Sequence, residues 1–315
     1  MHPLNLIPFD NGITAIDSYF QRPMMDAVHL IVDNQEAAFV DVGTKYSLPY
    51  LLGALDELGI SREAVKYVIV THIHLDHAGG AGQLMEQLPN ATFVVHPRGS
   101  RHMVDPSKLW AGALQVYGEE EMNSTYGELI PIPQSRVLEM PHESDLTLGN
   151  RTLQFFHTPG HAKHHYCIFD SAANSFFTGD TFGLSYREFD SDKGPFIFPT
   201  TTPIHFDPEA MHDSVNFLMS FKPKAMYLTH FSEVAAHESL ASSMHQQIDE
   251  LVELAEGLRN HPNRHEVLCD AVQKNLLTHI EAHGSPISKE ECLSLLAIDI
   301  DLNAQGLGVW LDSKR

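Results

Sequence analysis

Residues 71–77 read Thr-His-Ile-His-Leu-Asp-His and directly follow the apolar run 65–70, Val-Lys-Tyr-Val-Ile-Val. The run is typical of a buried strand, so the polar cluster is predicted to lie at a strand end. In an extended segment alternate side chains point to the same side. His72, His74 and Asp76 would then converge, while His77 points elsewhere and is available to a second ion. Packing alone gives no reason to gather these groups at a strand end, so the stretch predicts a metal site.

Three further candidate ligands each follow a short apolar run later in the chain. The preceding residues are Phe-Phe-His-Thr-Pro-Gly for His161, Phe-Phe-Thr-Gly for Asp180 and Met-Tyr-Leu-Thr for His230. Gly and Pro before the first two let the backbone turn sharply, so the ligand can project from a sheet rim into a cleft. The candidate metal ligands are therefore His72, His74, Asp76, His77, His161, Asp180 and His230.

In these motifs the chain resembles the metallo-β-lactamase-fold metallohydrolases, in the branch that contains glyoxalase II and the acyl-homoserine lactonases. The landmarks follow the family's order, starting with Asp41 in the segment Phe-Val-Asp-Val-Gly, and the resemblance covers about residues 25–235. The resemblance implies a first metal bound by His72, His74 and His161, a second bound by Asp76, His77 and His230, and Asp180 as the bridge. For Asp41 it implies support of the histidine loop from outside the ligand set.

The remaining pattern predicts an α/β fold. Residues 28–33 and 37–42 suit a hairpin, and residues 48–58 suit a helix that ends at Gly59. Further strands are expected at 91–95, 152–157, 165–169, 175–178 and 225–229, and further helices at 79–88 and 208–221. This two-half layout favours the αββα four-layer metallo-β-lactamase sandwich with a C-terminal helical extension.

A change in composition after His230 predicts a domain boundary near residue 234. We expect a catalytic domain of residues 1–234 and a C-terminal helical region of residues 235–315. The expected helices of that region cover 235–258, 266–282 and 298–311, with another opened by a capping box at Ser288. The region is a candidate for dimerisation or for packing onto the main body.

Two aromatic segments fit the regular pattern badly. Residues 98–139 are expected to form a helical insertion followed by a loop, and residues 182–206 a loop rich in aromatics. Binding residues often lie on loops that a rigid scaffold positions, so both segments are candidate walls of a substrate cleft. The alternative is that their aromatic side chains form small cores or a subunit contact.

The composition restricts the partners of the protein. The chain of 315 residues has 41 Asp and Glu against 20 Lys and Arg, a formal net charge of −21. Such a surface repels polyphosphate backbones, which disfavours nucleic acid and favours a small-molecule substrate. No apolar run approaches the ~20 residues of a membrane helix and no export signal is recognised, so we expect a cytoplasmic protein without membrane contact. The spacing of Cys167, Cys269 and Cys292 indicates neither a disulfide framework nor a thiolate zinc site.

Two metals held together predict a hydrolase. A hydroxide that bridges them would form near neutral pH, so no serine or cysteine nucleophile is needed, and Asp76 or a metal-bound water would carry a proton to the leaving group. Zinc suits the nitrogen-rich ligand set best, while iron and manganese are compatible with it. The substrate stays open among small esters, thioesters, lactones and phosphodiesters. Gly183 stands where lactonases of this fold commonly have tyrosine, which counts against a lactone.

Two other functions remain open. One is a di-iron redox enzyme that reduces oxygen or nitric oxide, although those proteins usually carry glutamate in place of His74 and need a flavin domain. The other is a binding or signalling protein that retains metals without turnover.

Overall fold

The structure is a computed structural model that describes residues 2–314. The chain divides into two compact units. The first comprises the residues up to His157 together with 164–179 and 224–233, and the second comprises 158–163, 180–223 and the residues from Val234 onward. The domain boundary near residue 234 stays a prediction.

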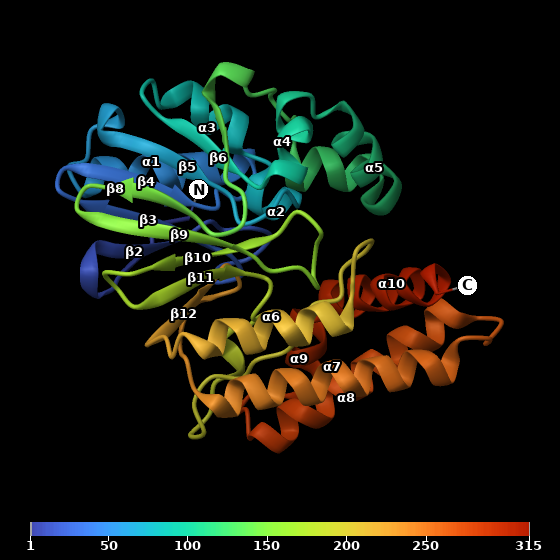
Figure 1. The fold of residues 1–315 in the computed structure, drawn as a ribbon. Coiled ribbons are helices and arrows are strands. Elements are labelled where there is room, and N and C mark those ends of the chain that lie inside the picture. Colours follow the sequence, from blue (N-terminus) through green and yellow to red (C-terminus); the bar gives the residue numbers. More distant parts are fainter. Residues whose placement is uncertain (1, 315) are drawn as a thin grey trace. The chain divides into compact units, whose positions relative to one another are not determined.

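The first unit contains a seven-stranded sheet whose spatial order follows the chain (Figure 1). Its strands are β1 (Leu6–Pro8), β2 (Ile13–Asp17), β3 (Ala27–Asp33), β4 (Glu36–Val40), β5 (Val65–Ile69), β6 (Thr92–Val95) and β7 (Val137–Glu139). The first four strands are antiparallel, and β4 to β7 are parallel to one another. The predicted hairpin of β3 and β4 is confirmed.

A second sheet has six strands in the order β13-β12-β11-β10-β9-β8. These are β8 (Ser144–Leu148), β9 (Arg151–His157), β10 (Tyr166–Asp170), β11 (Ser175–Gly179), β12 (Ala225–Leu228) and β13 (Ser232–Ala235). The two sheets share a buried apolar layer, to which β4 and β5 contribute Val40 and Ile69 and β9 and β10 contribute Phe155 and Ile168. Burial of this layer is the main force that holds the sheets together.

Helices cover the other face of the first sheet. They are α1 (Leu48–Glu57), α2 (Leu75–Ala78), α3 (Ala81–Gln87), α4 (Pro97–Val104) and α5 (Ser107–Glu121), the last followed by a π-helical turn at Met122–Tyr126. Leu51 and Leu55 of α1 pack with Phe39 and Val68 in one apolar cluster. As predicted, α1 ends before Gly59, whose φ of +67° favours glycine.

The second unit is mostly helical. Its helices are α6 (Pro208–Ser220), α7 (Glu238–Leu258), α8 (Arg264–His283), α9 (Lys289–Leu295) and α10 (Ala297–Ser313). The capping box at Ser288 is confirmed, since its side chain accepts a hydrogen bond from the Glu291 backbone while the Glu291 carboxylate accepts one from the Ser288 backbone. Figure 1 shows α7 and α8 side by side, and Glu250 of α7 accepts hydrogen bonds from Asn275 and His279 of α8.

The aromatic segment 182–206 forms part of the core of the second unit. Tyr186, Phe189 and Phe198 are fully buried. The Tyr186 hydroxyl donates to Asp299 of α10 at 3.1 Å, and the Thr201 amide donates to the Asn303 side chain at 2.5 Å. The alternative of a small aromatic core therefore accounts for these side chains.

The predicted fold class is confirmed as a mixed α/β arrangement of two sheets with flanking helices and a C-terminal helical part. Some elements were wrongly predicted. Residues 137–139, expected in a loop, form β7, and β1, β2, β8 and β13 were not expected at all. These strands are all three to five residues long, and alternation over so few residues is a weak signal that only pairing with a neighbouring strand resolves.

Candidate metal centre

The histidine loop leaves the buried strand β5 and turns into a short helix. The extended backbone continues through His74, which has φ −64° and ψ 154°, and α2 then begins at Leu75. The expectation that an extended chain runs through Asp76 is wrong, because Asp76 and His77 lie in the first turn of α2. Successive residues of a helix point about 100° apart, which still lets the Asp76 Oδ2 atom come within 3.5 Å of the His77 Nε2 atom.

Asp41 holds this loop in place from the end of β4. Its Oδ1 atom accepts a hydrogen bond from the Thr71 amide at 2.7 Å, and its Oδ2 atom accepts from Thr229 Oγ1 at 2.7 Å and from His77 Nδ1 at 2.8 Å. The carboxylate is buried, with 1% of the residue exposed. Asp41 therefore ties the ends of β5 and β12 to the histidine loop, in the supporting role that the family resemblance implies.

A second buried carboxylate supports His230 in the same way. Asp26 Oδ1 lies 2.7 Å from His230 Nδ1. A backbone hydrogen bond of 2.7 Å from the Ala27 amide to the Thr229 carbonyl brings the two segments together. Burial raises the pKa of the Asp26 carboxyl to about 6, and the neighbouring His230 opposes that rise. Sequence reasoning missed Asp26, because no motif marks it and its partner lies at the far end of the first unit's sequence.

These contacts bring potential metal-binding atoms of Asp76, His77 and His230 close to one another. One donor atom each from Asp76, His77 and His230 lie within 4.8 Å of one another. The Asp76 Oδ2 atom is 3.5 Å from the Nε2 atoms of both histidines. Because the Nδ1 atoms of His77 and His230 already face carboxylates, their Nε2 atoms are the ones turned to this common point.

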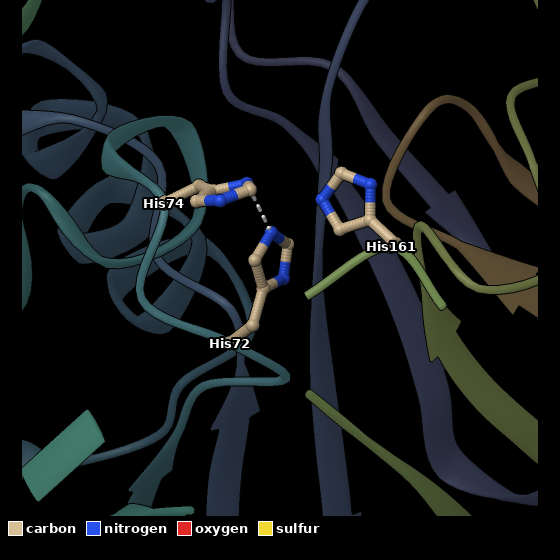
Figure 2. A group of neighbouring side chains, drawn as sticks. All are labelled: His72, His74 and His161. Atoms are coloured by element: carbon tan, nitrogen blue, oxygen red, sulfur yellow. Dashed lines mark hydrogen bonds between the residues drawn. The ribbon is translucent and has the colours of Figure 1, made fainter. Parts of the chain in front are cut away.

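Two other predicted ligands of the first unit also lie together. Figure 2 shows the imidazoles of His72 and His74, which share a hydrogen bond of 2.9 Å between His72 Nε2 and His74 Nδ1. The His72 side chain is fully buried, whereas His74 is partly exposed. The pair follows directly from the extended backbone, since residues two apart point to the same side.

The second unit holds the remaining two predicted ligands. His161, also drawn in Figure 2, lies in the loop after β9, and Asp180 follows β11. Within that unit His161 Nε2 is 3.4 Å from Asp180 Oδ2, and His161 Nδ1 contacts the Thr200 carbonyl at 3.5 Å. As in His77 and His230, the Nδ1 atom of His161 faces an oxygen atom and the Nε2 atom faces an aspartate.

A glycine makes room behind the histidine loop. Gly179 ends β11 with φ +47°, and a Cβ atom there would lie 2.6 Å from Thr71 Oγ1 and 2.6 Å from His165 Nε2. His165 is fully buried against the His72 ring, with a centroid distance of 4.8 Å. The Gly before Asp180 is therefore required by close packing as well as by the turn.

The donor set fits a divalent metal. Imidazole nitrogens and carboxylate oxygens are ligands for zinc, iron and manganese, and the carboxylates behind His77 and His230 fix each ring in the orientation that presents one nitrogen. Buried histidines and aspartates packed this closely are costly unless they are paired or bind a cation. The cluster is thus one that could hold a metal ion.

Two tyrosines of the insertion between β6 and β7 lie near this centre. The rings of Tyr117 and Tyr126 contact each other in a tilted arrangement, with a centroid distance of 5.0 Å. Burial raises the pKa of both hydroxyls, and the charge of Asp76 adds to the rise in each case. Both tyrosines therefore keep their hydroxyl protons at neutral pH.

Comparison with known proteins places the chain in a family. Residues 23–230 match the profile of the metallo-beta-lactamase superfamily, and the chain belongs to it. The archaeal metallo-beta-lactamase fold-containing protein ST1585 of Sulfurisphaera tokodaii is 26% identical over 66% of this chain and 73% of its own. The crystal structure of ST1585 superposes with a TM-score of 0.66 at 21% identity, covering 95% of this chain and 99% of that one.

Some relatives carry names that specify a reaction. A probable hydroxyacylglutathione hydrolase of Schizosaccharomyces pombe is 26% identical over 74% of this chain and 72% of its own. The acyl-coenzyme A thioesterase MBLAC2 of Gallus gallus is 27% identical over 55% of this chain and 64% of its own.

Within residues 2–314 no single helix has both the length and the hydropathy to cross a membrane. The bent pair of α9 and α10, with 61° between them, passes the same test of length and composition.

Proposed function

We propose that the protein is a dinuclear metal-dependent hydrolase of a small acyl substrate. One observation carries the proposal: His77 and His230 are each held at Nδ1 by a buried carboxylate, Asp41 and Asp26, and turn Nε2 toward Asp76. Histidines with a purely structural role would not both need a carboxylate at Nδ1 and an Nε2 atom turned toward the same third residue. Fixed imidazoles with one nitrogen presented are what a catalytic metal requires.

The complete ligand set of the proposal is the one that the family resemblance implies. Asp76, His77 and His230 would hold one metal, His72, His74 and His161 the other, and Asp180 would touch both. The His72–His74 pair in one unit and the His161–Asp180 pair in the other support this assignment by their short internal distances. Zinc is the proposed metal, because five of the seven donors are imidazoles, which suit zinc.

When bound, the two metals would lower the pKa of water between them toward neutrality and polarise the scissile carbonyl. The residues of the chain contribute three further effects. Asp41 and Asp26 keep the imidazoles oriented, and their burial excludes water from behind the ligands. The Asp76 carboxylate, with 22% of its side chain exposed, would pass a proton to the leaving group. The Tyr117 and Tyr126 hydroxyls would orient the substrate beside it.

Among small acyl substrates we favour a thioester. The two relatives described above are named for the hydrolysis of acyl groups carried on a thiol, as a probable hydroxyacylglutathione hydrolase and an acyl-coenzyme A thioesterase. A thiolate is also a better leaving group than an alkoxide, so its departure depends less on a proton from Asp76.

The first experiment is elemental mass spectrometry on protein purified without added metal. About two zinc or manganese ions per chain that are lost when the proposed ligands are substituted would support the hydrolase. About two irons with a visible absorption band would favour the di-iron redox alternative. Bound metal without turnover of glutathione thioesters, coenzyme A thioesters, simple esters, lactones or phosphodiesters would favour a binding or signalling protein.

Single substitutions then test the ligand assignment. His74→Ala should remove one of the two metals of this centre, whereas Asp180→Asn should weaken the binding of both, because the carboxylate would touch each. The circular dichroism of both variants should match the wild type, since each change lies at the rim of a sheet. An unchanged metal content in Asp180→Asn would rule out the bridging role.

A further inference from the structure

A second cluster of metal-binding side chains lies on the C-terminal helices, all of it within the second unit. His265 and Cys269 are four residues apart on α8, so they stand one turn apart on the same helix face. Asp301 faces them from α10. One donor atom each from these three residues lie within 4.8 Å of one another. The cluster contains none of the ligands of the proposed hydrolytic centre.

The three donors meet at a single nitrogen. His265 Nε2 is 3.0 Å from Asp301 Oδ1 and 3.6 Å from Cys269 Sγ. One imidazole nitrogen carries at most one proton, so it can make a good hydrogen bond to only one of these two neighbours. A cation between all three would satisfy a nitrogen, a sulfur and an oxygen at once.

The distances match a tetrahedral centre. With Zn–S of about 2.3 Å and Zn–N and Zn–O of about 2.05 Å, tetrahedral geometry separates sulfur from nitrogen by ~3.6 Å and nitrogen from oxygen by ~3.3 Å. The observed separations are 3.6 Å and 3.0 Å. An outward movement of Asp301 by a few tenths of an ångström would therefore bring the nitrogen–oxygen separation to the tetrahedral value.

A further side chain orients the carboxylate. Gln305, one turn along α10, donates a hydrogen bond of 2.7 Å from Nε2 to Asp301 Oδ2. The other oxygen, Oδ1, is the one that faces His265. This is the usual arrangement around a metal ligand, where an outer hydrogen bond fixes one oxygen and leaves the other for the ion.

We propose that His265, Cys269 and Asp301 form a zinc-type metal site that ties α8 to α10, with water in the fourth position. The mixed sulfur, nitrogen and oxygen set suits zinc or cobalt and suits magnesium or calcium poorly. The proposal is independent of the hydrolase function. The spacing of the cysteines predicted no thiolate site, because only helix packing brings Cys269 to its partners.

Cobalt titration of the purified full-length protein tests the site. A thiolate bound to Co²⁺ produces an intense near-ultraviolet charge-transfer band, whereas the proposed hydrolytic centre has only nitrogen and oxygen donors and cannot produce one. We expect this band in the wild type and its loss on addition of zinc. Cys269→Ser should abolish it, and the matched control Cys292→Ser, which changes a buried cysteine of α9, should retain it.

Two variants that retain Cys269 test whether loss of the band reflects loss of a ligand or misfolding. Asp301→Asn should weaken Co²⁺ binding strongly, and Gln305→Leu about tenfold. Zinc should raise the melting temperature of the wild type more than that of Cys269→Ser. The proposal is overturned if saturating Co²⁺ gives no charge-transfer band, if the band persists in Cys269→Ser, or if Asp301→Asn binds as tightly as the wild type.

Discussion

Replacement of Asp41 by Asn should disable the metal centre by reversing the tautomer of His77. The carboxylate accepts the His77 Nδ1 proton at 2.8 Å, which leaves Nε2 deprotonated toward Asp76. Asparagine has nearly the same volume, but its amide nitrogen donates a proton. If it takes the Oδ2 position, it donates to Nδ1, and the ring proton moves to Nε2, where it blocks a metal.

The magnitude follows from the contacts of the lost oxygen. A hydrogen bond to a charged group contributes about 1.5–3 kcal/mol, and the Thr71 and Thr229 hydroxyls can rotate to accept from the new amide. We therefore expect a stability loss of about 1.5–3 kcal/mol in the metal-free protein. Removal of such a support typically weakens metal binding about 10- to 100-fold, or ~1.4–2.7 kcal/mol.

The assay is competition with a chelator of known affinity, combined with urea unfolding of the metal-free protein. The matched control is Thr229→Val, which removes the 2.7 Å hydrogen bond to the same Asp41 oxygen without touching His77. It should cost about 1–2 kcal/mol of stability and little metal affinity. Equal losses of metal affinity in Asp41→Asn and Thr229→Val would refute the tautomer argument, as would unchanged binding in Asp41→Asn.

Two further predictions concern stability. Gly306→Ala should lower the free energy of unfolding in urea by at least ~2 kcal/mol, because the new Cβ would lie 1.6 Å from the Thr201 carbonyl oxygen. The control Gly308→Ala, on the same helix, meets nothing closer than 3.9 Å and should raise the free energy of unfolding by up to ~1 kcal/mol. Similar effects of the two changes would contradict the close approach at Gly306. Burial lowers the pKa of His96 from 6.5 to about 4, so its contribution to stability is complete above pH 6.5 and is lost as the pH falls toward 4. Between pH 7 and 5 the wild type should lose about 1–2 kcal/mol more unfolding free energy than His96→Asn, which keeps an acceptor for the helix N-terminus; parallel pH profiles would show that His96 is not buried in its neutral form.

Local patterns in the sequence determined much of this protein. The apolar strand at 65–69, the helix ending before Gly59 and the capping box at Ser288 were predicted correctly, because each depends on residues within a few positions of one another. The cluster of histidines and aspartate at 72–77 pointed to a metal centre for the same reason. The choice among thioester, ester and lactone stays a prediction, since it depends on the walls of a site rather than on its ligands.

Only the tertiary structure decided which distant groups support the ligands. The pairing of Asp26 with His230 requires β3 and the end of β12 to lie together, and the meeting of Cys269 with Asp301 requires α8 to pack on α10. Neither pair has a fixed sequence spacing, so no motif can record it. The physical reason is that hydrogen bonds and ion pairs between remote segments form only after hydrophobic burial has set the positions of strands and helices.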